Sequence, residues 1–261
     1  MMETNKNIAE YSLNIGWLYP DLMSIYGDRG NIITLQKRCE ARGIKVVIKN
    51  ISLQSPISEL KTSDLFFMGG SQDSQQTIVS ADLKKEKGGV LAEMIEQGIP
   101  GLYICGAYQL LGKYYKEANG LIIDGLGIFD IYTENPGLNH KRFMGNVTAN
   151  LNKELFSDYG DSNSLVGFEN HGGHTYLGKN IKPLGEVIKG FGNNGEDRTE
   201  GAVYKNSIGS YFHGPILPKN PYLADFLIAK ALEKKYGHPI KLEKLNDTLS
   251  SQAHDNMLKN L

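Results

Sequence analysis

Hydrophobic positions in the first half of the chain fall into short apolar runs separated by longer amphipathic stretches, several of which end at glycine. Runs of strand length occupy 13–19, 44–51, 64–70 and 99–105, and helical patterns occupy 30–43, 90–98 and 108–120. Such a succession of strands and helices predicts a parallel sheet with helices on both faces.

The pattern changes after Gly120, where short strand-like pieces are separated by Gly, Asn and Asp. These pieces lie at 126–132, 141–147, 165–171, 185–191, 201–206 and 209–215. They predict antiparallel or mixed sheet added to the parallel core. A stretch that starts with Pro221 and ends at Gly237 predicts an amphipathic helix. We therefore expect one α/β domain over 1–240, followed by a polar segment, 241–261, that is a tail or a docking segment.

Composition narrows the class of protein. The 261 residues are 40% hydrophobic, enough for a sizeable core, and the net charge of −1 provides no basic field for nucleic acid. The two cysteines, Cys39 and Cys105, favour a reducing, cytoplasmic setting, with Cys39 in the core. Residues 1–11 contain no apolar signal region and no run of 18 apolar residues follows, so we expect neither export nor a membrane segment.

The segment GLYICGAYQLLG, 101–112, carries the first candidate chemistry. Cys105 ends an apolar run, and Gly106 relieves crowding where the strand turns into a helix. Such turns face the crevice at the carboxyl ends of parallel strands. Free cysteine also packs as a small hydrophobe, so the residues alone leave open a structural thiol.

A nucleophilic thiol at this place would need a base. Lowering a thiol pKa from about 8.5 to roughly 6 takes about 3.4 kcal/mol, whereas a helix N-terminus supplies about 2 kcal/mol at most. His213 is the strongest candidate, because Gly214 and Pro215 force the chain out of the sheet directly after it. His171 and His174 also follow a strand but lack a third metal ligand, so no metal site is expected. The remaining histidines, expected to be solvated, are His140, His238 and His254.

Several segments together resemble the class I glutamine amidotransferases, in the branch related to cobyric acid synthase. YICGAYQLLG resembles the nucleophile segment, FFMGGSQD the oxyanion loop and GSYFHGPIL the histidine segment. LYPDLMSIYGDRGNI, RFMGNV and GFENHGG extend the resemblance over most of the chain. The match is nearest to the glutaminase subunits of bacterial synthases that amidate peptidoglycan.

The resemblance implies a catalytic role for five residues. Cys105 would attack the amide carbon of L-glutamine and form a thioester, and His213 would carry the proton to the departing ammonia. Backbone N–H groups of Gly70 or Ser71, together with that of Gly106, would form the oxyanion hole.

The same resemblance implies that Arg142 binds the α-carboxylate of glutamine through its guanidinium fork and that Gln109 also contacts the substrate. Two positions depart from the family pattern. Ala107 replaces a second glycine, and Pro215 stands where many members carry an acid two residues after the histidine. Either a Cys–His dyad suffices or a partner subunit supplies the acid, and we favour the partner.

The ammonia would need a consumer, because the chain contains no G-x-x-x-x-G-K-[ST] phosphate loop. The resemblance implies a heterodimer with a Mur-ligase-like subunit, MurT, that uses ATP and Mg²⁺, while this chain needs no cofactor. That pair would convert the D-glutamate of the lipid II stem peptide to D-isoglutamine at the inner face of the cytoplasmic membrane. Alternatives are another Cys-dependent hydrolase, a non-catalytic regulatory subunit, or a cobyrinic acid acceptor.

Overall fold

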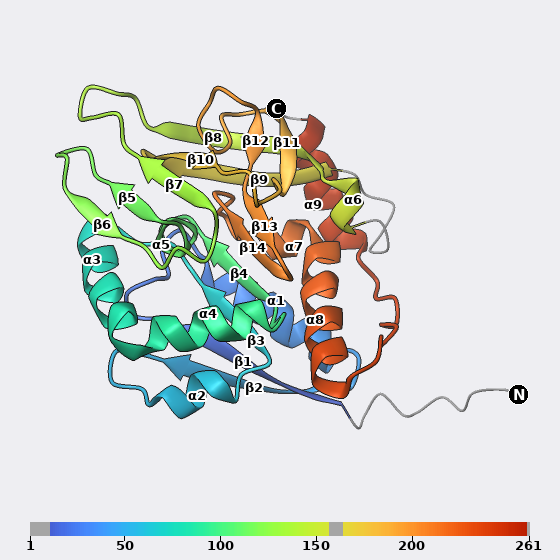
Figure 1. Ribbon diagram of the computed structural model, residues 1–261. Coiled ribbons are helices and arrows are strands. Elements are labelled where there is room, and N and C mark those ends of the chain that lie inside the picture. Colours follow the sequence, from blue (N-terminus) through green and yellow to red (C-terminus); the bar gives the residue numbers. More distant parts are fainter. Residues whose placement is uncertain (1–10, 157–163, 260–261) are drawn as a thin grey trace, which may run out of the picture.

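The computed structural model describes residues 11–156 and 164–259 (Figure 1). Expectations about the first ten residues and the last two lie outside the described residues. A six-stranded sheet forms the centre, in the order β13-β14-β4-β3-β1-β2. The strands are β1 (Ser12–Leu18), β2 (Lys45–Ile51), β3 (Leu65–Met68), β4 (Gly101–Ile104), β13 (Ala202–Tyr204) and β14 (Ser207–Ser210).

Five of these strands are parallel, and β13 joins the edge antiparallel to β14. Every residue of β3 and β4 is buried, as expected for central parallel strands covered on both faces. Because all five parallel strands point the same way, their carboxyl ends meet at one edge of the sheet, where loops can gather functional side chains.

The helices form layers around this sheet (Figure 1). α8 contacts β1, β3 and α1, while α3, η2 and α4 form a continuous helical run. The helices are α1 (Arg29–Glu40), α2 (Ile57–Lys61), α3 (Asp73–Asp82), the π-helix η2 (Leu83–Lys87), α4 (Gly88–Glu96), α5 (Gly106–Leu111), α6 (Lys153–Phe156), α7 (Ile216–Lys219), α8 (Pro221–Tyr236) and α9 (Thr248–Lys259). Among the described residues, none of the helices is long and apolar enough to cross a bilayer.

The second half of the chain adds two four-stranded sheets, in the orders β10-β7-β5-β6 and β12-β11-β8-β9. Their strands are β5 (Tyr114–Lys116), β6 (Ile122–Asp124), β7 (Ile131–Glu134), β8 (Phe143–Leu151), β9 (Ser164–His171), β10 (His174–Leu177), β11 (Gly185–Lys189) and β12 (Thr199–Glu200). Nearly all of their pairings are antiparallel, which confirms the predicted change after Gly120. The mixed α/β class and the parallel core are likewise confirmed.

The helix predicted over 108–120 is wrong in its second half. α5 ends at Leu111, and Gly112 is extended. A Cβ on Gly112 would lie 2.7 Å from the Ile131 side chain, so the close approach of β7 requires glycine there. The chain then forms β5, which pairs with β6 and β7. Pairing with distant strands therefore overrides a local helical pattern.

The segment after Tyr236 is held against the domain as far as the structure describes it. Arg42 donates to the Glu243 carbonyl, and α9 packs against α7 and β9. His254, expected to be solvated, is instead buried, with Nε2 at 2.8 Å from Ser164 Oγ and Nδ1 at 2.8 Å from the Lys219 carbonyl. Residues 241–259 are therefore in contact with the rest of the chain, and the choice between a tail and a docking segment stays a prediction.

Candidate active site

The residues at the centre of the candidate site lie in the loops after four neighbouring parallel strands, at one edge of the sheet. The loops after β1, β3, β4 and β14 carry Asp28, Ser71, Cys105 and His213 respectively. The ends of these strands are paired with one another: Leu18 with Met68, Met68 with Tyr103, and Ile104 with Ser210. Residues separated by up to 185 positions in the sequence therefore meet at one place.

Cys105 occupies a strained turn between β4 and α5. Its backbone has φ 53° and ψ −107°, an unfavourable region for a residue with a Cβ. The Cys105 N–H is held by the Ser210 carbonyl at 2.8 Å, and the side chain is 6% exposed and lines a pocket. This is the strand-to-helix elbow that the sequence predicted, whereas the other cysteine, Cys39, is buried in the core as expected.

His213 lies fully buried next to Cys105, and its Nδ1 is 3.2 Å from Asp28 Oδ1. Asp28 is also fully buried. This contact corrects the expectation that the acid comes from a partner subunit: Pro215 supplies none, but Asp28 of the same chain does. Asp28 lies in the quoted segment LYPDLMSIYGDRGNI, yet no spacing rule connects it to a histidine 185 positions away.

The surroundings of His213 favour its charged form. Burial by itself opposes protonation, but the neighbouring Cys105 and the hydrogen bond to Asp28 together raise the pKa of His213 to about 10. Since Nδ1 is occupied by Asp28, Nε2 remains for Cys105. The geometry therefore suits a thiolate–imidazolium pair backed by a carboxylate.

Gly70 allows the oxyanion loop to approach this pair. A Cβ on Gly70 would lie 2.9 Å from His213 Cε1 and 3.2 Å from Cys105 Cβ. Its N–H, however, donates to Asp28 Oδ2 at 2.7 Å. In the structure this N–H therefore holds the acid in place, and the oxyanion role suggested for Gly70 stays a prediction.

The N–H groups of Ser71 and Gly106 remain as oxyanion donors. Neither has a hydrogen-bond partner among the described residues. A Cβ on Gly106 would lie 3.0 Å from both Ser71 Oγ and the Gln76 side chain, so the two segments are in close contact. Their proposed role in catalysis stays a prediction.

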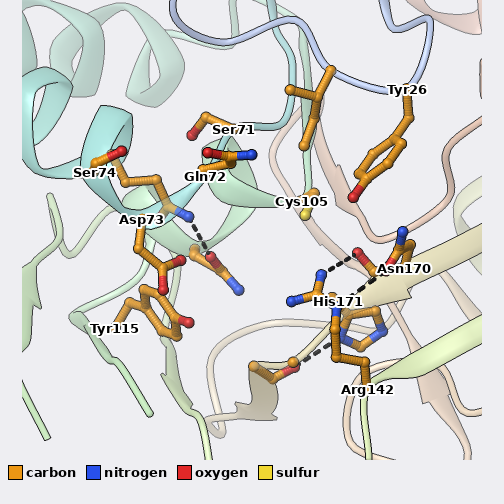
Figure 2. A pocket seen from close by; sticks show the side chains of 15 residues that line it. Tyr26, Ser71, Gln72, Asp73, Ser74, Cys105, Tyr115, Arg142, Asn170 and His171 are labelled. Carbon is orange, nitrogen blue, oxygen red and sulfur yellow. Dashed lines mark hydrogen bonds between the residues drawn. The ribbon is translucent and has the colours of Figure 1, made fainter. Parts of the chain in front are cut away.

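A pocket of about 450 Å³ opens beside Cys105 (Figure 2). Arg142, from the loop before β8, lines one side, and its Nε and Nη2 donate to the side chain and backbone carbonyl of Asn170 at 3.2 and 3.0 Å. Gln109 lines the pocket from α5 and is only 3% exposed. The structure thus brings both predicted substrate-binding residues into the pocket of Cys105.

Three residues that line this pocket each have a buried polar atom without a hydrogen-bond partner among the described residues. These atoms are Ser71 Oγ, Gln76 Oε1 and His171 Nε2. A buried unpaired polar group costs about 1–3 kcal/mol, so each is more stable when a ligand or water pairs with it. Sequence reasoning missed Gln76, which lies on α3, a helix that it did not predict.

His171 differs in character from His213. Its Nδ1 is 2.7 Å from the Gly173 carbonyl, and its ring stacks on Tyr211 at 3.6 Å between centroids. Burial lowers the pKa of His171 to about 3, so the ring is neutral. His174 stacks on Phe143, and no group of three or more metal-ligating side chains occurs within 11–156 and 164–259.

The carboxyl edge of the parallel sheet thus brings the thiol of Cys105 and the His213–Asp28 pair together beside a polar pocket. The chain belongs to the CobB/CobQ-like glutamine amidotransferase domain family, whose model matches residues 14–221.

Two curated relatives extend over nearly the whole chain. It is 44% identical to "Lipid II isoglutaminyl synthase (glutamine-hydrolyzing) subunit GatD" of Streptococcus pneumoniae, over 93% of this chain and 89% of the relative. It is 41% identical to the protein of the same name from Staphylococcus aureus, over 93% of each chain. A probable cobyric acid synthase of Methanococcus maripaludis is 31% identical over 76% of this chain but only 38% of its own length.

Solved structures agree on the fold. A glutamine amidotransferase crystal structure aligns with TM-score 0.54 at 15% identity, covering 83% of this chain and 98% of that one. The glutaminase domain of CTPS from Trypanosoma brucei with bound acivicin aligns at 0.53 and 14% identity, covering 89% and 98%. A ThuA-like protein from Bacteroides uniformis reaches 0.55 at 11% identity, covering 91% and 97%.

Proposed function

We propose that this chain is the glutaminase subunit of a lipid II isoglutaminyl synthase. The Cys105–His213–Asp28 arrangement carries the proposal, because it provides nucleophile, proton carrier and orienting acid within one chain. The identity of 44% and 41% to two proteins named as GatD subunits supports the substrate and the pathway.

The reaction follows from the positions of these groups. The Cys105 thiolate attacks the side-chain amide carbon of L-glutamine, and the N–H groups of Ser71 and Gly106 stabilise the oxyanion. His213 donates a proton to the departing ammonia, which leaves a thioester on Cys105. Water then attacks the thioester with His213 as base, releasing glutamate and the free thiol.

Ammonia released here is useful only where an activated acceptor is present. The word "subunit" in the relatives' names supports a partner. We propose a heterodimer with the Mur-ligase-like MurT, which would use ATP and Mg²⁺ to activate the D-glutamate α-carboxylate of lipid II. Work on that lipid would place the complex at the inner face of the cytoplasmic membrane.

Glutamine-dependent amidation of lipid II by the chain with its native partner tests this function. We expect D-isoglutamine with wild type and none with Cys105→Ala, while ammonium chloride restores amidation in the Cys105→Ala complex. Restoration by ammonium separates loss of the glutaminase from loss of the synthase. Failure of the wild-type complex to amidate lipid II with either nitrogen source would refute the proposal.

A further inference from the structure

Two residues of α3 that line the pocket carry hydrogen-bond acceptors. Asp73 and Gln76 are three positions apart, which places them on the same face of the helix, and both line the pocket. Gln76 Nε2 donates to Gln109 Oε1 at 3.0 Å, and Gln109 Nε2 donates to the Tyr211 hydroxyl at 3.0 Å. These bonds fix the Gln76 amide, and its buried Oε1 has no hydrogen-bond partner among the described residues.

The pocket therefore has walls of opposite charge. Figure 2 shows Asp73 beside Tyr115 on one side, and Arg142 beside Asn170 on the other. Burial raises the pKa of Asp73, while the Tyr115 hydroxyl and the charge of Arg142 act in the opposite direction. A partly desolvated carboxylate facing a guanidinium across a pocket suits a ligand that carries both charges itself.

We propose that the Asp73 carboxylate and Gln76 Oε1 bind the α-ammonium group of glutamine, while Arg142 takes its α-carboxylate. An ammonium group has three N–H donors, so it can pair with both acceptors at once. This assignment rests on the proposed glutaminase function and adds a specificity determinant to it.

If the assignment is right, the pocket should select an α-amino acid over other primary amides. Glutaramate, the analogue of glutamine without the α-amino group, keeps the carboxylate and the carboxamide. In its complex Gln76 Oε1 would remain unpaired, and the partly desolvated Asp73 carboxylate would have no ammonium group beside it. The pocket should therefore bind glutaramate more weakly than L-glutamine, and the difference should depend on Asp73.

Calorimetric binding to the full chain carrying Cys105→Ala, which cannot turn the ligand over, measures this dependence. The dissociation constants for L-glutamine and glutaramate are compared with and without Asp73→Asn. We expect Asp73→Asn to weaken L-glutamine binding about 10- to 100-fold, as for loss of a hydrogen bond to a charged group, and to leave glutaramate unchanged. The preference for L-glutamine should then largely disappear.

Glu86→Gln is the matched control, since it neutralises an exposed carboxylate in η2, directly beyond α3, outside this pocket. It should retain the preference. The proposal is overturned if Asp73→Asn keeps the preference, or if it weakens both ligands equally, which would indicate a merely structural role. Because the measurement involves no turnover, its failure is distinct from failure of the glutaminase function, which wild-type ammonia release reports.

Discussion

Two buried histidines close to the same pocket have opposite protonation states. His213 has Asp28 on Nδ1 and Cys105 nearby, which raise its pKa to about 10 against the effect of burial. His171 has only a backbone carbonyl on Nδ1, and burial lowers its pKa to about 3, assisted by the charge of His213. Burial is thus common to both, and the ionised partner decides the charge.

The acids near the two rings differ in the same way. Asp28 accepts from the Gly70 N–H and faces a cation. Glu169, whose Oε2 lies 3.9 Å from His171 Nε2, and Glu200, which accepts from Ser210 Oγ and the Tyr211 N–H, are also buried. Burial raises the pKa of each to about 7, although hydrogen bonds from backbone N–H groups and, for Glu200, from Ser210 partly compensate. Of these two buried regions, only the one around His213 stabilises charged groups, and that region contains the nucleophile.

Replacing His213 and His171 in turn should give the largest difference in activity between the two regions. His213→Ala should lower the kcat of glutamine hydrolysis by at least about 10³-fold, because it removes the proton carrier. His171→Gln should keep kcat within about tenfold and act mainly on KM, since the neutral ring only lines the pocket. Steady-state ammonia release measures both, with exposed His238→Ala as the control. Equal losses of kcat in the two variants would remove the distinction.

Asp28→Asn should have the next largest effect. The Asn oxygen can still accept from Gly70, but its amide then presents donors to His213 Nδ1 and favours the wrong tautomer. We expect kcat to fall about 10- to 10³-fold, less than for His213→Ala, because the thiolate–imidazolium pair partly persists. Ammonia release by the complex measures this, with exposed Asp21→Asn as control. Unchanged activity would indicate that the partner subunit, and not Asp28, supplies the acid.

Glu200→Gln tests, through the free energy of unfolding, whether the region around Glu200 holds a neutral acid. The Glu200 pKa is raised from 4.5 to about 7 on folding, so wild-type stability should decline as pH rises from about 4.5 to about 7. The substituted amide does not titrate and can still accept from Ser210 Oγ and the Tyr211 N–H. Urea unfolding should therefore show the variant gaining on the order of 1–3 kcal/mol relative to wild type between pH 4.5 and pH 8. Glu186→Gln, at an exposed position, is the control. The prediction would be wrong if the difference in free energy of unfolding between Glu200→Gln and wild type stayed the same from pH 4.5 to pH 8.

The sequence predicts those elements and site residues that depend on local signals. The apolar run before Cys105 and the Gly214–Pro215 exit after His213 are local features, and the structure places both residues together. Asp28 and Gln76 could not be found in this way, because their roles depend on contacts across the sheet edge and with α5. The helix expected beyond Leu111 failed for the same reason, since β5 exists through pairing with β7.

The central claim is that Cys105 is a nucleophile activated within this chain by His213. Covalent labelling with the glutamine analogue 6-diazo-5-oxo-norleucine, followed by peptide mass spectrometry on the chain with its partner, tests it most directly. We predict one adduct, on Cys105, which forms far more slowly in His213→Ala, while Cys39 stays unlabelled. The absence of an adduct on Cys105 in wild type, or equal labelling rates in the two proteins, would contradict it.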